Sequence, residues 1–192
     1  MSQTLTDRVK AIKNTPGTGE NVLVSEINGA FDKFDNNFVP SAKIVNTATQ
    51  AITTGSTQAI VFNTTRHDTY AARAEGPMAD LLNDLIVIRK NGLYMVSLSA
   101  DFAGNVSTAG YRAISIKRGA TIMKRITQDA NTVTNVDTAM ELSDIFVLTA
   151  GDQISATALQ TSGVSINLDP TIGGVNDSVS LAVAWLGGST EV

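Results

Sequence analysis

The side chains with the clearest chemical potential are the single histidine and the carboxylate beside it, His67 and Asp68. A histidine next to an aspartate is typical of general-base catalysis and of metal sites. Adjacent residues of a strand point to opposite faces of a sheet, and the sequence has no second histidine and no cysteine to complete a site. We therefore interpret both residues as part of a polar surface or loop.

Other motifs of catalysis or cofactor binding are incomplete. Serine is plentiful, but no Gly-x-Ser-x-Gly elbow occurs, and Gly17-x-Gly19 lacks the third glycine and the preceding strand of a dinucleotide site. Four aspartates could offer oxygen ligands to Ca²⁺ but lack EF-hand spacing, and we interpret them as solvated loop charges: Asp129, Asp137, Asp144 and Asp152. The sequence thus predicts no enzyme activity, catalytic residue, metal or cofactor.

Two aromatic residues, Tyr94 and Trp185, could form platforms on which sugars stack. Both lie in segments where apolar and polar residues alternate, which favours packing in a core or between subunits. The segments 104–110, 129–137 and 169–177 are better candidates for contact with a receptor or a neighbouring protein, because their Asn, Thr, Gly and Asp residues form adaptable polar surfaces.

Composition excludes several classes of function. The chain has 192 residues, of which 43% are hydrophobic and 17% are charged, so it can bury a core. A net charge of −4 argues against nucleic acid as a partner. No apolar run approaches the roughly 20 residues of a membrane span, and residues 1–13 lack the uninterrupted apolar core of a signal peptide. We expect a protein that acts without a membrane and is not secreted by the general route.

The first 45 residues have helical periodicity, in two pieces separated by the breaker stretch 14–19. Leu5, Val9 and Ile12 are spaced four and three apart, as on one face of a short amphipathic helix. The second piece ends before Pro40 and carries a narrow apolar stripe with heptad-like spacing: Ile27, Phe31, Phe34 and Phe38. Such a stripe on a short helix requires a packing partner.

Beyond this region the sequence changes to strand-sized segments separated by turn residues. Val, Ile and Thr together make up more than a quarter of the chain, and these side chains suit a pleated sheet. Alternation predicts strands near 50–54, 58–63, 84–90, 92–102, 111–118, 121–127, 138–149, 153–160, 163–168 and 178–187. So many short strands indicate a mostly β, antiparallel sandwich or jelly roll over residues 46–192.

Four segments, taken in order, resemble the globular head of the C1q and tumour-necrosis-factor superfamily. They are Ile88–Val96, in which Gly92 and Tyr94 open a long strand; Ala113–Gly119, a strand followed by a polar turn; Phe146–Ile154, with its Gly-Asp pair; and the closing stretch Val183–Gly187. The Gly151-Asp152 pair is also expected to form a tight turn on physical grounds. The resemblance implies a ten-stranded jelly roll that assembles as a homotrimer.

A head behind a short helical segment resembles bacteriophage and other viral fibre, spike and decoration proteins. We therefore expect a non-enzymatic virion structural protein, made in a bacterial cytoplasm and displayed on the capsid or, as the less favoured location, on the tail. Residues 1–45 would form the anchor and trimerisation segment: Leu5, Val9 and Ile12 would bind the major capsid protein or another shell protein, and the stripe Ile27, Phe31, Phe34 and Phe38 would meet on the trimer axis.

Two other functions stay open at this point. The head could be the tip of a tail fibre or spike that binds a host surface receptor or a glycan. A bacterial enzyme on a cupin-like barrel would need clustered metal ligands, which a sequence with one histidine does not supply.

Overall fold

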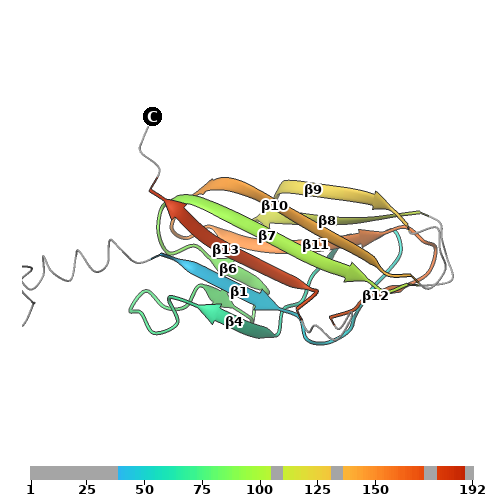
Figure 1. The fold of residues 1–192 in the computed structure, drawn as a ribbon, viewed down its shortest axis with the longest axis horizontal. Coiled ribbons are helices and arrows are strands. Elements are labelled where there is room, and N and C mark those ends of the chain that lie inside the picture. Colours follow the sequence, from blue (N-terminus) through green and yellow to red (C-terminus); the bar gives the residue numbers. More distant parts are fainter. Residues whose placement is uncertain (1–38, 105–109, 131–135, 171–176, 189–192) are drawn as a thin grey trace, which may run out of the picture. The chain divides into compact units, whose positions relative to one another are not determined.

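The computed structural model describes residues 39–104, 110–130, 136–170 and 177–188, and these contain strands and turns but no helix (Figure 1). The chain divides into two compact units, Met1–Phe38 and Val39–Val192, and the described residues all belong to the second. The strands are β1 (Ser41–Val45), β2 (Gln50–Ile52), β3 (Gln58–Ala59), β4 (Thr64–Asp68), β5 (Ala79–Asp80), β6 (Leu85–Val87), β7 (Gly92–Phe102), β8 (Tyr111–Arg118), β9 (Thr121–Asp129), β10 (Thr138–Leu148), β11 (Gln153–Gln160), β12 (Ile166–Leu168) and β13 (Ser180–Gly187).

The first sheet is built around β7. β10 pairs with one side of β7 along its whole length, and β13 pairs with the other side, followed by β1 and β4. β12 meets the end of β7 and extends to β2. All named pairs are antiparallel, so β10 and β4 form opposite edges of this sheet.

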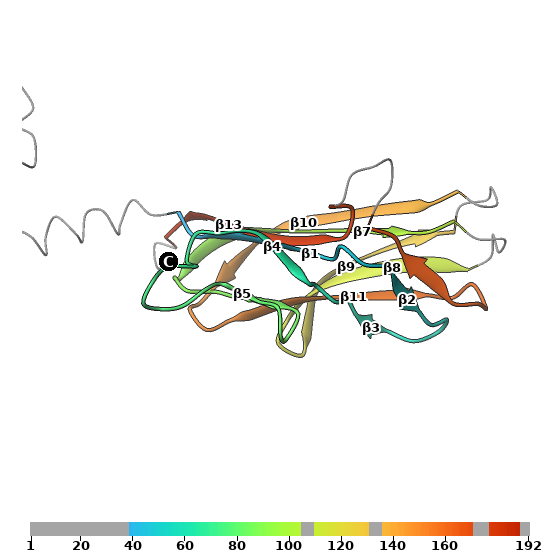
Figure 2. The same ribbon diagram turned by 90° about the horizontal axis from the view of Figure 1, so that it is seen from below.

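The second sheet has the order β5-β6-β11-β8-β9, with β3 pairing β11 beyond the end of β6. β5 and β9 are therefore its two edges. Figure 2 shows the two sheets as layers, with β13, β7 and β10 in one and β11 and β8 in the other. The described residues form the antiparallel sandwich that the strand pattern predicts.

The core fills the space between the sheets. Alternate residues of β7 point inward, among them Tyr94, Leu98 and Phe102, and they face Ile114 and Ile116 of β8 from the other sheet. These five side chains are fully or almost fully buried. Buried residues alternate with more exposed ones along β10 and along β7 as far as Ala100, and this alternation is the physical reason that the long strands could be predicted from sequence.

The predicted boundary at residue 45 is wrong in one respect. β1 lies between β13 and β4, so Ser41–Val45 belong to the head, which begins at Val39. β1 is only five residues long and includes Lys43, so its alternation is brief. The predicted helical pieces, and with them the helical extension of the fold class, fall outside the described residues.

Two glycine turns have the conformations that the sequence predicts. Gly151 has a φ of +95°, and the Asp152 carboxylate accepts the N–H of Thr149 at 2.9 Å. Gly119, between β8 and β9, has a φ of +54°. Positive φ values favour glycine because a Cβ atom would strain the backbone. Among the described residues no helix is long and apolar enough to cross a membrane.

Candidate functional site

His67 and Asp68, the pair with the clearest catalytic potential, do not form a site together. They lie on the edge strand β4, where His67 is exposed. Both oxygens of Asp68 are engaged: Oδ1 accepts the N–H of Tyr70 and Oδ2 accepts the N–H of Ala79, each at 2.8 Å. The carboxylate therefore holds the chain segment between β4 and β5 in place, and His67 has the surface position that we predicted.

The four aspartates considered as Ca²⁺ ligands are engaged at separate places. Asp144 on β10 accepts a hydrogen bond of 2.8 Å from the ammonium of Lys124 on β9, and this ion pair joins the edges of the two sheets. Asp152 supports the turn after β10. Asp137 accepts the N–H of Gly104 at 2.6 Å, and Asp129 ends β9. Within the described ranges no three His, Asp or Glu side chains are grouped so that they could hold a metal ion.

Asp101, near the end of β7, is a buried carboxyl group that sequence reasoning missed. Its Oδ1 has no hydrogen-bond partner. Burial, the largest cause, and the charges of Asp137 and Asp169 together raise the pKa of Asp101 to about 6. Nothing in the alternating stretch around it distinguishes Asp101 from the solvent-facing serines at positions 97 and 99.

Tyr94 and Trp185 are packing residues. Tyr94 is fully buried, and its hydroxyl donates to the backbone oxygen of Lys90 at 2.7 Å. Burial raises the pKa of Tyr94 well above its ordinary value. The Trp185 indole donates to the backbone oxygen of Asn91 at 3.2 Å, and the Lys90 ammonium lies 4.3 Å from the ring centroid. The Lys90 side chain thus covers one face of the indole ring, so a sugar could not stack on that face.

The outer face of the first sheet carries a cluster of exposed apolar side chains, which we call the apolar face: Leu93, Met95, Ile145, Val147 and Leu186. The register explains the cluster. Ile145 pairs with Met95, Val147 pairs with Leu93, and Leu186 lies on β13 beside them. Cross-strand partners point to the same face, so the side chains are neighbours.

The apolar face occupies one end of the sheet, and polar or small residues occupy the rest of the same face. Moving along β7, the next cross-strand pairs are Ser97 with Ser143 and Ser99 with Glu141. On the β13 side, Ala182 and Ala184 add small side chains to the same face. The five members of the apolar face are between 36% and 59% exposed, which is unusual for so many large apolar side chains in contact.

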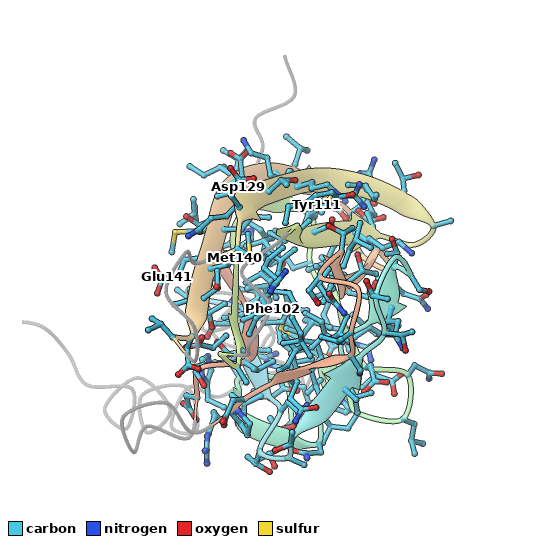
Figure 3. The ribbon with its side chains drawn as sticks, turned by 90° about the vertical axis from the view of Figure 1, so that its right-hand side faces the viewer. Phe102, Tyr111, Asp129, Met140 and Glu141 are labelled. Atoms are coloured by element: carbon cyan, nitrogen blue, oxygen red, sulfur yellow. The ribbon has the colours of Figure 1, made fainter. Side chains whose placement is uncertain are left out.

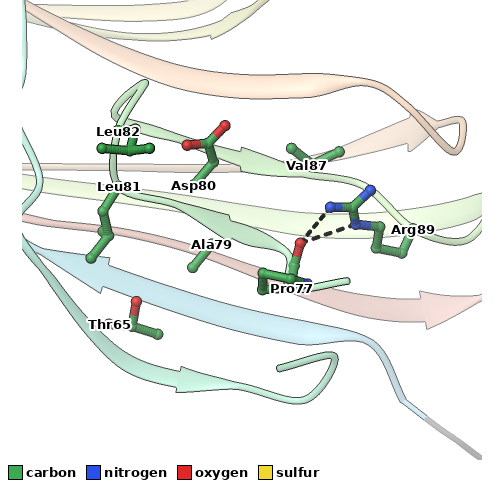
Figure 4. Close-up of a pocket in the computed structure, with 8 residues that line it drawn as sticks. All are labelled: Thr65, Pro77, Ala79, Asp80, Leu81, Leu82, Val87 and Arg89. Atoms are coloured by element: carbon green, nitrogen blue, oxygen red, sulfur yellow. Dashed lines mark hydrogen bonds between the residues drawn. The ribbon is translucent and has the colours of Figure 1, made fainter. Parts of the chain in front are cut away.

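A pocket of about 420 Å³ lies at the opposite edge of the sandwich, between β4 and the β5–β6 hairpin (Figure 4). We call it the edge pocket. Its lining is mainly apolar, with one hydroxyl, one carboxylate and one guanidinium: Thr65, Pro77, Ala79, Asp80, Leu81, Leu82, Val87 and Arg89. The lining can therefore offer a bound group apolar contact together with one charge of each sign.

The residues predicted to anchor the particle, Leu5, Val9 and Ile12, lie outside the described residues, as does the predicted axial stripe of Ile27, Phe31, Phe34 and Phe38. The structure therefore tests neither prediction. The segments predicted as contact loops, 104–110, 129–137 and 169–177, are described only in part.

Comparison with known proteins gives the fold. No family model matches the sequence, and no curated protein matches it. Among solved structures, the chain is similar to the structure of Eiger TNF from S. frugiperda, with a TM-score of 0.55 and 11% sequence identity, over 80% of this chain and 96% of that one. The head is thus an antiparallel β sandwich similar to the tumour-necrosis-factor jelly roll.

Proposed function

We propose that this chain is a non-enzymatic structural protein whose heads assemble as a homotrimer through the apolar face. In the fuller form of the proposal, the trimer is a decoration or head-fibre protein of a bacteriophage particle, held by residues 1–45. The observation that carries the proposal is the apolar face itself, a contiguous cluster on the first sheet that the head leaves in water.

Burial of this face supplies the driving force for assembly. Each of the five side chains is about half exposed, so covering it contributes about 1 kcal/mol, or about 5 kcal/mol for each copy before the entropy of association is subtracted. The small side chains of Ala182 and Ala184 beside the face allow a neighbouring copy to approach closely. The tumour-necrosis-factor-like fold supports a three-fold arrangement over other symmetries.

A non-enzymatic role is supported by what the polar side chains do. Asp68, the natural partner of His67 in a catalytic pair, has both oxygens occupied by backbone N–H groups. On the first sheet the hydroxyls of Ser99 and Ser180 form a hydrogen bond of 2.8 Å with each other. These groups stabilise the fold and do not present an activated nucleophile.

Display on a virion is supported by the sequence alone. Leu5, Val9 and Ile12 have the spacing of a helix that packs into a shell protein, and the breaker stretch 14–19 separates them from the predicted axial stripe. Three copies in one trimer would multiply a weak single attachment through effective concentration.

Sedimentation equilibrium of the full chain tests the assembly. The wild type is expected at three times the chain mass, and Met95→Lys or Ile145→Lys is expected to reduce the assembly to single chains. Val164→Lys is the matched control, because Val164 is similarly exposed but lies outside the apolar face. A wild type that stays monomeric would overturn the trimer.

A deletion of residues 1–23 tests the display. The shortened protein should still form trimers but should fail to join particles in a co-assembly experiment. If the deleted form is incorporated as well as the wild type, the anchor is rejected while the trimer stands.

A second candidate function, binding of a glycan or receptor, is favoured by one pair of residues. Tyr111 is exposed, and it pairs with Asp129 across β8 and β9 (Figure 3). An exposed aromatic ring offers a surface for stacking, and a neighbouring carboxylate can accept hydrogen bonds from hydroxyl groups. A glycan array with the wild type and Tyr111→Ala tests this function, and equal or absent binding for both proteins would exclude Tyr111 as its site.

A further inference from the structure

The edge pocket contains the most exposed large apolar side chain in the described part of the head. Leu82 is 96% exposed and lies in the turn that joins β5 to β6. A single exposed leucine is ordinary, but this one lies at the rim of a pocket whose walls include Pro77, Ala79 and Val87. The pocket volume of about 420 Å³ is ample for one leucine side chain.

The pocket also carries one charge of each sign. The Arg89 guanidinium donates to the backbone oxygen of Pro77 through Nε at 3.0 Å and Nη2 at 2.6 Å. The Asp80 carboxylate accepts the side-chain amide of Asn83 at 2.8 Å and its N–H at 3.3 Å. Among the described residues, neither Arg89 nor Asp80 forms an ion pair. Each charge could therefore gain an oppositely charged partner from another molecule.

The order of these groups makes the surface complementary to itself. Asp80 and Leu82 lie toward one end of the pocket, Arg89 lies at the other end, and Val87 lies between the two charges (Figure 4). A two-fold axis through the middle of such a surface brings Asp80 of one copy to Arg89 of the other, twice. The same rotation carries Leu82 of each copy over the apolar wall beside Arg89 of its neighbour.

We propose that two heads bind each other back to back through their edge pockets, with Leu82 of each copy inserted into the pocket of the other and two Asp80–Arg89 ion pairs around it. The occupant of the pocket is thus a second copy of this chain. The contact is small, so we expect a weak and reversible association.

This contact is compatible with the proposed trimer. The edge pocket lies at the β4 and β5 edges of the two sheets, whereas β10, which carries Ile145 and Val147 of the apolar face, forms the opposite edge of the first sheet. Covering the apolar face therefore leaves the edge pocket free. If the proposed function holds, the edge pocket joins neighbouring trimers side by side on a surface.

Sedimentation velocity of the full chain over increasing concentration tests the proposal. We expect the wild type to associate reversibly at high concentration, first to a species of twice its base mass and then to larger species, because a trimer carries three edge pockets. Leu82→Ala should lower the association constant by about a hundredfold, about tenfold for each of the two copies of the contact. Val164→Ala, an exposed apolar residue away from the pocket, is the matched control and should not change the constant.

Charge reversal provides the specific test. Asp80→Arg places two guanidinium groups against each other across the axis, and Arg89→Asp places two carboxylates there, so each single variant should abolish the doubled species. The double variant D80R/R89D restores opposite charges across the axis and should recover association. Circular dichroism of each variant confirms that the head is folded before its association is interpreted.

The outcomes separate this contact from the trimer. If Met95→Lys produces single chains that still pair through Leu82, the apolar face and the edge pocket act independently, and both proposals are supported. A wild type with no doubled species at about millimolar concentration would overturn the edge contact, whatever the state of the trimer. Failure of the double variant to recover association, with both single variants and the double variant folded, would reject the two-fold ion pairs.

Discussion

The backbone N–H of Asp169 donates a hydrogen bond of 2.9 Å to the backbone oxygen of Asp101, where β12 meets the end of β7. This bond holds two acidic residues close together, and Asp137 contributes a third carboxylate to the same end of the sandwich through its bond to Gly104. Asp101 is the buried member of the three, and its Oδ1 lacks a donor. Its ionisation is therefore disfavoured in the folded state.

We predict that this group makes the head less stable as the pH rises. The pKa of Asp101 is about 6 in the folded chain and has an ordinary value of 3.8, so between these values the folded state binds more protons than the unfolded state. Below about pH 4 Asp101 is protonated in both states and does not lower the free energy of unfolding. As the pH rises to about 6, the free energy of unfolding falls by at most about 3 kcal/mol. Asp101→Asn should remove the fall and stabilise the head near neutral pH.

Urea unfolding at several pH values between about 4 and 7.5 measures this effect. Asp129→Asn is the control, because Asp129 is exposed on the same end of the sandwich and its removal should leave the pH dependence intact. Parallel curves for the wild type and Asp101→Asn would contradict the prediction.

The start of β7 supports a second prediction, on stability. Gly92 has a φ of +155°, and a Cβ atom at this position would collide with the Trp185 indole nitrogen and the backbone oxygen of Gly187. Gly92→Ala should therefore destabilise the head by about 2–4 kcal/mol, because both the backbone and the Trp185 ring must shift.

Gly163→Ala separates strain from collision. Gly163 also has a positive φ, +85°, but a Cβ atom there would meet nothing within 4 Å. Its substitution should cost only the backbone strain, about 1 kcal/mol. Equal losses for the two variants, measured by thermal unfolding, would show that the contact with Trp185 carries no weight.

The long strands could be predicted from sequence because their two faces meet different environments. β7 runs over Gly92–Phe102, as predicted, and β8 and β11 also lie at their predicted positions. β4 was missed because its sequence, Thr64–Asp68, is polar throughout, and it owes its conformation to pairing with β1. An edge strand of this kind has little alternation of its own.

The two surfaces proposed for binding also differ in how far the sequence alone predicts them. Leu93 and Met95 alternate with buried residues, so sequence alone could mark them as one face of a strand, but only the register with β10 brings Ile145 and Val147 beside them. The edge pocket arises from β4 and the β5–β6 hairpin, which are distant in sequence. The burial of Asp101 likewise depends on neighbours from β12 and the segment before β10.

A third prediction concerns Gln160, a fully buried amide at the end of β11. Its Nε2 donates to the backbone oxygens of Ile52 and Val164 at 2.9 and 2.6 Å, and its Oε1 accepts the N–H and hydroxyl of Ser162 at 2.8 and 2.7 Å. Gln160→Met keeps the volume of the side chain but removes all four of these hydrogen bonds from a buried position. The loss should be about 2–4 kcal/mol in chemical unfolding.

Gln128→Met is the matched control for this substitution. Gln128 is exposed on β9, so the same chemical change there should alter the free energy of unfolding by less than about 0.5 kcal/mol. If Gln160→Met is equally well tolerated, the amide network is not a determinant of stability and the neighbouring turn adapts without it.

A final prediction uses salt to distinguish the two proposed contacts between copies. The five side chains of the apolar face are uncharged, so the trimer should be at least as stable in about 1 M sodium chloride as at low salt. The edge contact includes Asp80 and Arg89, and screening over about 3 Å at that ionic strength should weaken it. Sedimentation velocity at the two salt concentrations should therefore show trimers in both and the doubled species mainly at low salt. Loss of the trimer at high salt would mean that charges, and not the apolar face, hold the heads together.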